Sequence, residues 1–427
     1  MPLPGAPLHM TTLNQVQLDE LHLLEKKLVR KWVFWEEEDD ITVIAEQNEI
    51  RKQCDSIVEQ IDQCIDNNHA SEKLVLFMGR FYLEDKSLAP WTSTKSKNIS
   101  TRFFQRIVAD ANMKEKCESF IVDKIHNTLQ EMKSANLSSE VNSSGYKKTS
   151  KLKIGGKLIG STYTKMLDKM EKFKNDHLTE LGHLHFLIEK TDMEKNWRYI
   201  LPLLLALLDD TDVLVKREAA LLLDMICLKL AIIEPIPANI IIKSQTMPLF
   251  KTAIQPLLLA LPSLTPETKS VEILLPAYKA IFDLFQVSIT DKLEFYNSMS
   301  ALLNDTLLPS IGKCKDYAQV SLELTLILQE FLQRCGDFSK VLTKQVIYTL
   351  LTVLMDPYIS FAPAVVSAIL LVIQECMASN SAESRKRFKY DVLGCMGILK
   401  RRLQNRENHL DANIEGQIEV LVNCVNI

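Results

Sequence analysis

Residues 199–224 read Tyr199-Ile-Leu-Pro-Leu-Leu-Leu-Ala-Leu-Leu-Asp-Asp-Thr-Asp-Val-Leu-Val-Lys-Arg-Glu-Ala-Ala-Leu-Leu-Leu-Asp224, and they decide the fold class. Two apolar stripes at helical spacing flank a polar break at 209–212. The stripes are Ile200, Leu203, Leu204, Leu207 and Leu208, then Val215, Ala219, Leu222 and Ile226. The break predicts a short turn, because aspartates cap free N–H groups of the next helix and favour its dipole. Two helices joined in this way resemble one HEAT-type unit, which buries its apolar faces only by stacking on neighbours.

Degraded copies of this unit recur further along the chain. Apolar segments that begin at Ile254, Met299 and Val346 each lead into a second apolar helix. The expected turn residues are spaced by 53, 47 and 47 positions and are Asp209, Pro262, Pro309 and Asp356. HEAT-type repeats have a period of about 40–47 residues. The sequence therefore predicts an all-α protein, an α-solenoid of degenerate HEAT-like repeats, ended by cap helices at 384–403 and 413–425.

The composition agrees with a helical fold and excludes several classes of protein. A chain of 427 residues can bury a large core, and 12 glycines and 15 prolines are too few for a protein of many strands and tight turns. Hydrophobic residues at 47% and charged residues at 24% are typical of a globular chain. The net charge of −4 argues against a general nucleic-acid binder, which must neutralise phosphates.

The nine cysteines are an odd number and widely scattered, with no Cys-x-x-Cys pair, so the sequence favours free thiols in a reducing compartment. The longest uncharged run, 357–374, contains prolines and polar residues and therefore predicts a buried helix rather than a membrane span. The N-terminus has no secretory signal, and we interpret residues 1–9 as vector-derived.

We expect three further segments along the chain. Residues 10–133 form an N-terminal helical region, with helices at 13–35, 41–65, 72–83 and about 102–132. Residues 134–153, rich in Ser, Asn and Lys, form a flexible linker or loop, and residues 154–427 form the HEAT-like repeat region with its C-terminal cap. The acidic run 36–40 and the Lys-rich stretch 147–174 fit solvated faces, with docking to a charged partner as the alternative.

The sequence predicts no catalytic, cofactor or metal site. The glycines at 155–156 do not form a P-loop, because Lys157 is followed by Leu158 and no strand precedes. The histidines at 177, 183 and 185 have no Cys or acid placed to complete a metal shell, so we expect partly exposed helix histidines. No Ser stands in a Gly-x-Ser-x-Gly elbow. An enzyme that uses the 155–156 region on a nucleotide is kept as an alternative.

The last helices carry a basic cluster that is a candidate partner-binding surface. Its members are Arg385, Lys386, Arg387, Lys400, Arg401 and Arg402. The alternative is the polar outer face that any solenoid needs at its end.

The stretch that begins at Asn196 resembles the signature of the Tel-two-interacting protein two family, in particular its fungal members. In that family a Trp, a Pro-led apolar helix, an Asp-Asp turn and a Lys precede HEAT-like helices. The residues that match are Trp197, Pro202, Leu207, Asp209, Asp210 and Lys216. The Arg-Glu-Ala-Ala run after Lys216 departs from the small residue expected there.

The resemblance implies a non-catalytic, cytoplasmic and nuclear subunit of the Triple T complex, with Tel-two and Tti-one as partners. That complex works with the ninety-kilodalton heat-shock chaperone and R2TP-type partners to help phosphatidylinositol-3-kinase-related kinases fold and assemble. The resemblance implies no cofactor, no direct nucleic-acid contact and no membrane. A generic HEAT-repeat adaptor that binds peptide cargo or another scaffold is the alternative function.

Overall fold

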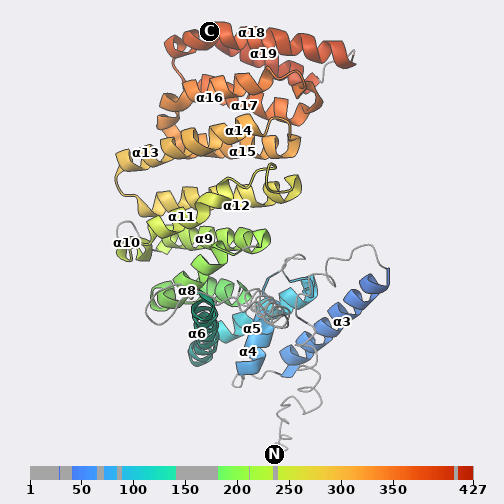
Figure 1. The fold of residues 1–427 in the computed structure, drawn as a ribbon, viewed down its shortest axis with the longest axis vertical. Helices are drawn as coiled ribbons and strands as arrows, with labels where there is room; N and C mark the ends of the chain where they lie inside the picture. The colour runs from blue at the N-terminus through green and yellow to red at the C-terminus, as the bar shows by residue number, and fades with distance from the viewer. Residues whose placement is uncertain are drawn as a thin grey trace, which may run out of the picture. The chain divides into compact units, whose positions relative to one another are not determined.

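The computed structural model describes residue 28 and residues 41–64, 72–83, 89–140, 181–210, 212–233, 239–407 and 412–426, and these consist of helices and turns without a strand (Figure 1). The prediction of an all-α protein is confirmed for this part of the chain. The Cα positions divide the chain into two compact units, residues 1–207 and 208–427. No helix among the described residues is long and apolar enough to cross a membrane.

Several predictions fall on residues outside these ranges. They concern residues 1–9, the acidic run 36–40, the Lys-rich stretch 147–174 with Gly155 and Gly156, and all of the helix at 13–35 except Leu28. Residues 134–140 are helical and continue α6 (Ala111–Glu140), although the sequence predicted a loop there. The remainder of the expected loop, 141–153, is not described, so the domain limits stay a prediction.

The first unit contains helices of 8 to 30 residues around an aromatic core. The helices are α3 (Ile41–Cys64), α4 (Glu72–Gly79), α5 (Thr94–Ala109), α6 and α8 (Met193–Leu208), and residues 181–190 are also helical. Within this unit α5 packs on α3 and α6, and α4 packs on α6. The aromatic core residues are Phe77, Phe81, Tyr82, Phe103, Phe104 and Phe186. Their rings meet edge-on or tilted, as aromatic pairs prefer.

One close approach in this unit explains a glycine and corrects an expectation. A Cβ at Gly79 would lie 2.2 Å from the ring of His183, so only glycine fits where the 181–190 helix crosses α4. His183 is fully buried, and its Nε2 lies 3.2 Å from the carbonyl oxygen of Leu76. The expectation of a partly exposed helix histidine was therefore wrong for His183, and it holds for His185, which is half-buried.

The second unit begins with α9 and consists of helices that follow one another in chain order (Figure 1). They are α9 (Val213–Ile233), α10 (Ile240–Lys243), α11 (Met247–Leu258), α12 (Glu267–Ser288), α13 (Lys292–Leu302), α14 (Leu308–Lys313), α15 (Ala318–Cys335), α16 (Ser339–Leu354), α17 (Pro363–Ser379), α18 (Ala382–Glu407) and α19 (Ala412–Asn426). A π-helical turn at Leu303–Leu307 joins α13 to α14. The predicted stripe of α9 is fully buried in this unit, as its apolar spacing required.

Helices of the second unit form two series, and within each series every helix packs on the next. In one series α9 contacts α12, α12 contacts α15, α15 contacts α17, and α17 contacts α19; in the other α14 contacts α16, and α16 contacts α18. Polar side chains bridge successive members of the first series at separations of 55, 51, 46 and 50 residues: Arg217–Glu272, Asp283–Arg334, Gln329–Glu375 and Ser367–Gln417. The contacts thus recur at close to the period predicted from the sequence.

The turns do not all lie where the prolines predicted. Pro262 and Pro357 stand in turns, but Pro309 lies at the start of α14, directly after the π-helical turn at Leu303–Leu307. The turn between α14 and α15 is formed instead by residues 314–317. Pro202 and Pro256 lie inside α8 and α11. Of the four expected turn residues, Asp209, Pro262 and Asp356 therefore stand in turns or bends, and the prediction for Pro309 was wrong.

Candidate functional site: the C-terminal helical layers

The six residues of the predicted motif have different surroundings. Trp197 and Leu207 are buried, while Pro202 and Asp209 are exposed and Asp210 and Lys216 are half-buried. Trp197, Pro202 and Leu207 belong to the first unit, and the other three belong to the second. The two buried members contribute to the hydrophobic core, and the other four lie wholly or partly at the surface.

The turn after α8 is closed by side-chain oxygens of Asp210 and Asp212. Oδ1 of Asp210 accepts a hydrogen bond of 2.7 Å from the N–H of Asp212, and Oδ1 of Asp212 accepts one of 3.0 Å from the N–H of Leu214. The predicted turn is confirmed, because α8 ends at Leu208 and α9 begins at Val213. Asp212, which lies outside the predicted motif, caps α9, and Asp210 closes the turn before it, while Asp209 is exposed.

Some side chains of the predicted basic cluster bond to other helices, and others have no partner among the described residues. The guanidinium of Arg402 donates to the carbonyls of Met355 and Asp356, and that of Arg385 donates to the carbonyls of Asn380 and Cys424. These bonds tie α18 to the ends of neighbouring helices, because backbone carbonyls at helix ends have no intrahelical partner. Lys400 forms an ion pair of 3.0 Å with Glu415 of α19.

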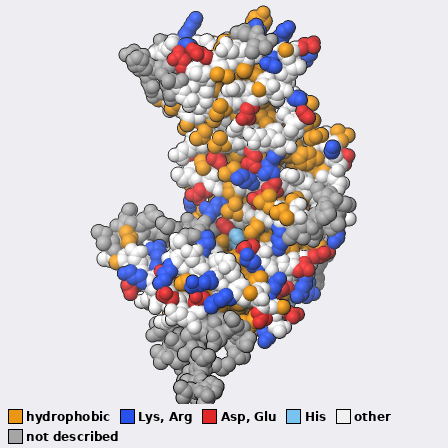
Figure 2. Space-filling view, turned by 180° about the vertical axis from the view of Figure 1, so that it is seen from behind, with side chains coloured by type: hydrophobic (Ala, Val, Ile, Leu, Met, Phe, Trp, Pro, Cys, Tyr) orange, Lys and Arg blue, Asp and Glu red, His pale blue; other side chains and the backbone are white. Residues whose placement is uncertain are grey.

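The other three members of the cluster are Lys386, Arg387 and Arg401. All three are exposed, and the described part of the chain offers them no hydrogen bond or ion pair. They are the members of the cluster whose charge is available to a binding partner. The part of the surface formed by α18 and α19 carries basic, acidic and apolar side chains close together (Figure 2).

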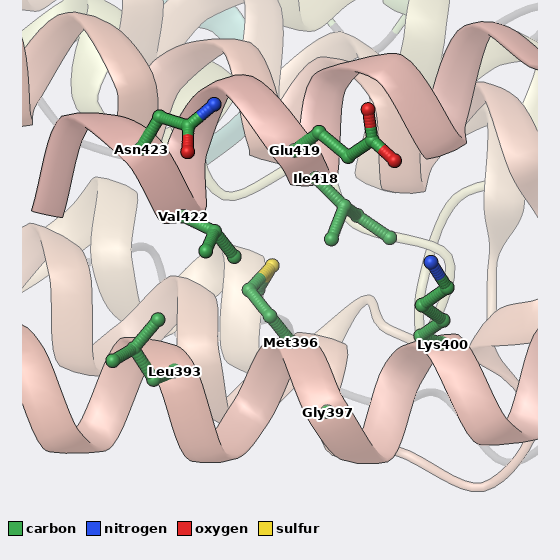
Figure 3. A pocket seen from close by; sticks show the side chains of 8 residues that line it. All are labelled: Leu393, Met396, Gly397, Lys400, Ile418, Glu419, Val422 and Asn423. Carbon is green, nitrogen blue, oxygen red and sulfur yellow. The ribbon is translucent and has the colours of Figure 1, made fainter. Parts of the chain in front are cut away.

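A groove of about 380 Å³ runs between α18 and α19, and we call it the terminal groove (Figure 3). Its apolar lining consists of Leu393, Met396, Gly397, Ile418 and Val422, and Lys400, Glu419 and Asn423 supply its polar atoms. Met396 and Ile418 are buried at its floor. Sequence reasoning missed this groove, although a glycine inside a helix, at position 397, was a signal for it.

Large side chains are also exposed beside the groove and on α16. Tyr390 on α18 is 83% exposed, and Val341 on α16 is 67% exposed. The hydroxyl of Tyr348 donates a hydrogen bond of 2.8 Å to Asp391, which links α16 to α18 and raises the pKa of Tyr348. Aromatic and aliphatic side chains amid basic residues are typical of protein–protein contact surfaces.

A carboxyl pair, one member buried and the other half-buried, lies where α9, α12 and α15 meet. Asp224 of α9 faces Asp283 of α12, and Arg334 of α15 forms an ion pair with Asp283 and a second, of 2.8 Å, with Glu330. Burial, and then the neighbouring Asp283 carboxyl, raise the pKa of Asp224 well above its usual value. Protonated Asp224 can donate a hydrogen bond to Asp283. The thiol of Cys227 lies near both carboxyls and is fully buried, and burial, followed by the two carboxyls, raises its pKa. A thiol held in its neutral form is unreactive, so the group fits a contact between layers.

No cluster of His, Cys, Asp and Glu among the described residues is arranged to hold a metal ion. The glycines at 155–156, the one candidate for nucleotide binding, lie outside the described ranges. The described geometry therefore offers surfaces for binding another protein and no constellation for a reaction.

Comparison with known proteins gives one match. The sequence matches the profile of the Tti2 family over residues 76–361, which is more than half of the chain and includes the stretch at 199–224. No curated protein and no solved structure matches the chain. The matched range ends in the turn before α17, so the terminal groove lies beyond it. On this match, together with the helical fold and the Trp197 to Lys216 motif, the chain belongs to the Tti2 family.

Proposed function

We propose that this protein is a non-catalytic scaffold subunit of the Triple T complex that binds the Tel-two and Tti-one subunits. The observation that carries the proposal is membership of the Tti2 family, which implies a role as a Triple T subunit. In the proposed role the complex works with the ninety-kilodalton heat-shock chaperone to support folding, stability and assembly of phosphatidylinositol-3-kinase-related kinases, in cytoplasm and nucleus.

We also propose that the second unit is a HEAT-like α-solenoid, in line with its two series of packed helices and with side-chain bridges at separations of 46–55 residues. A stacked array offers long surfaces to a partner, because each layer contacts only its neighbours and leaves its sides open. A scaffold needs such surfaces and needs no catalytic residue, which agrees with the family being one of non-catalytic subunits.

Within the second unit the contact is proposed to lie in the layers from α16 to α19. Three unpaired basic side chains, exposed aromatic residues and an apolar groove meet there. The partner surface that fits is acidic with apolar residues, since charge complementarity directs association and apolar burial supplies affinity.

Affinity purification followed by mass spectrometry tests the function. Tagged full-length protein should recover Tel-two and Tti-one at near-stoichiometric amounts. The same chain without residues 346–427 should lose them while the remaining helices still unfold cooperatively. Retained binding by the truncated chain would place the contact elsewhere, and recovery of unrelated peptide cargo in place of the two subunits would favour a generic adaptor.

A further inference from the structure

The terminal groove lies on the last pair of helices of the second unit. Within this unit α19 packs on α17, and α18 packs on α16. α18 and α19 also pack on each other, and the groove runs along the seam between them, with side chains of both helices pointing into it (Figure 3). No described element of the chain lies over this seam. The groove is thus the place where a further helix would continue the series of packed helices.

The floor of the groove is built to admit another backbone closely. Gly397 stands in the interior of α18, where glycine lowers helix stability relative to alanine. A Cβ at this position would meet no atom of the described residues within 4 Å. Packing among the described residues therefore does not require glycine here, in contrast to Gly79, which His183 crowds. A partner helix lying across Gly397 could approach α18 more closely than across any larger residue.

The charges along the groove distinguish its two edges. Lys386 and Lys389 precede Leu393 and Gly397 on the same stripe of α18, at helical spacing, and the described residues give neither lysine a partner. Glu415 of α19 already pairs with Lys400 at the other end of the groove. The α18 edge thus presents unpaired positive charge at the end near Leu393, and the α19 edge presents the exposed Glu419.

We infer that the terminal groove binds one amphipathic α-helix of a partner subunit, with aliphatic side chains on the groove floor and carboxylates along the edge that meets Lys386 and Lys389. The occupant is helical because the groove continues the helix-on-helix packing of the second unit. The inference rests on the proposed function for the identity of the partner, and it adds the binding site and the chemistry of the bound segment.

The test fills the groove without disturbing the fold. Gly397→Leu places a side chain where the chain itself leaves open space, and leucine favours the helix over glycine, so the melting temperature should stay equal or rise by about 2 °C. Affinity for a purified Tel-two–Tti-one pair, measured by biolayer interferometry, should fall at least about tenfold. Gly312→Leu in α14 is the matched control, because a Cβ there also meets nothing, and its affinity should equal that of wild type.

A charge test is independent of the groove volume. Lys386→Glu combined with Lys389→Glu should weaken binding at least about fivefold, and the loss should shrink as ionic strength rises. Lys292→Glu, an exposed position on α13 outside the layers from α16 to α19, is the control and should have little effect.

The outcomes separate this inference from the proposed function. If wild type binds neither subunit, the proposed function is overturned. If wild type binds and both groove variants bind equally well, the function stands and the groove assignment is wrong. Two results with unchanged subunit affinity would also overturn the inference. Loss of self-association in a groove variant would assign the groove to a second copy of the protein. A change in the protease protection of residues 1–40 would assign it to the chain's own N-terminus.

Discussion

The Nζ of Lys315 lies 2.6 Å from Oδ2 of Asp356, 41 residues further along the chain. This pair joins the turn before α15 to the turn after α16, so that two successive layers are connected at their turns. Asp356 also accepts a hydrogen bond from the N–H of Tyr358, and Lys315, the largest influence, lowers the pKa of its carboxyl. The pair links two turns in the same way as the side-chain bridges link the long helices.

Asp356→Ala should therefore destabilise the C-terminal layers by on the order of 1 kcal/mol, because it removes a turn hydrogen bond and the partner of Lys315. Chemical denaturation checks this. A carboxyl whose pKa is lowered by folding stabilises the protein above the unfolded pKa of about 4 and loses this effect as the pH falls. The difference between wild type and Asp356→Ala should accordingly shrink below pH 4, and a constant difference down to pH 2 would contradict the account.

Asp224 predicts the opposite pH dependence. Its pKa is raised by folding, so its contribution to stability is complete below the unfolded carboxyl pKa of about 4 and is lost as the pH rises towards 8. Asp224→Asn keeps a donor for Asp283 and should stabilise the protein at pH 8 by on the order of 1 kcal/mol, since solvent screens a half-exposed group. At pH 4 the variant and wild type should unfold at nearly the same denaturant concentration. Equal stability at pH 8 would mean that Asp224 ionises there without cost.

The turn after α8 gives a prediction with an internal control. Asp210→Ala and Asp212→Ala should each lower the free energy of unfolding by about 1 kcal/mol, because each removes a hydrogen bond to the backbone of the turn. Asp209→Ala should change it by less than about 0.5 kcal/mol, since Asp209 is exposed and makes no such bond in the structure. Thermal unfolding of the three variants ranks them, and an Asp209 variant as unstable as the other two would contradict the assignment.

The cysteines provide a test of burial. Of the eight that the structure describes, seven are buried, and burial raises the pKa of Cys54 and Cys376 to about 12 and that of Cys314 and Cys395 to about 11. Thiols react as thiolates, so these positions should resist iodoacetamide in the folded protein, and Cys424, which is half-buried, should react first among the eight. Peptide mass spectrometry after timed alkylation reads this order. Equal labelling of Cys227 and Cys424 would show that the layers open easily.

The helical part of the fold was predictable because it depends on local spacing. Apolar residues at intervals of three and four predicted the helices that the structure shows as α9, α12 and α15. The Asp-rich turn was predictable because its chemistry lies within four consecutive positions. Proline was a weaker marker, since its ring is accepted at the start of a helix, as at Pro309, and also inside helices, as at Pro202.

The terminal groove and the sorting of the basic cluster could not be predicted, because they depend on distant parts of the chain. Arg385 and Arg402 look like Lys386 and Arg401 in the sequence, yet the first two donate to carbonyls from other helices or their ends. Which arginine meets a helix end is decided by how α18 lies across the turn at Met355 and Asp356. The boundary of the first unit at residue 207 likewise depends on packing, and no local sequence pattern indicates it.

The most direct test of the central claim is the mass of the assembly formed by the purified full-length protein with purified Tel-two and Tti-one. Size-exclusion chromatography with multi-angle light scattering measures it. The account predicts a single species that contains all three chains, and Gly397→Leu should reduce that species while Gly312→Leu leaves it intact. Elution of the wild-type protein alone, apart from a Tel-two–Tti-one pair, would contradict the account.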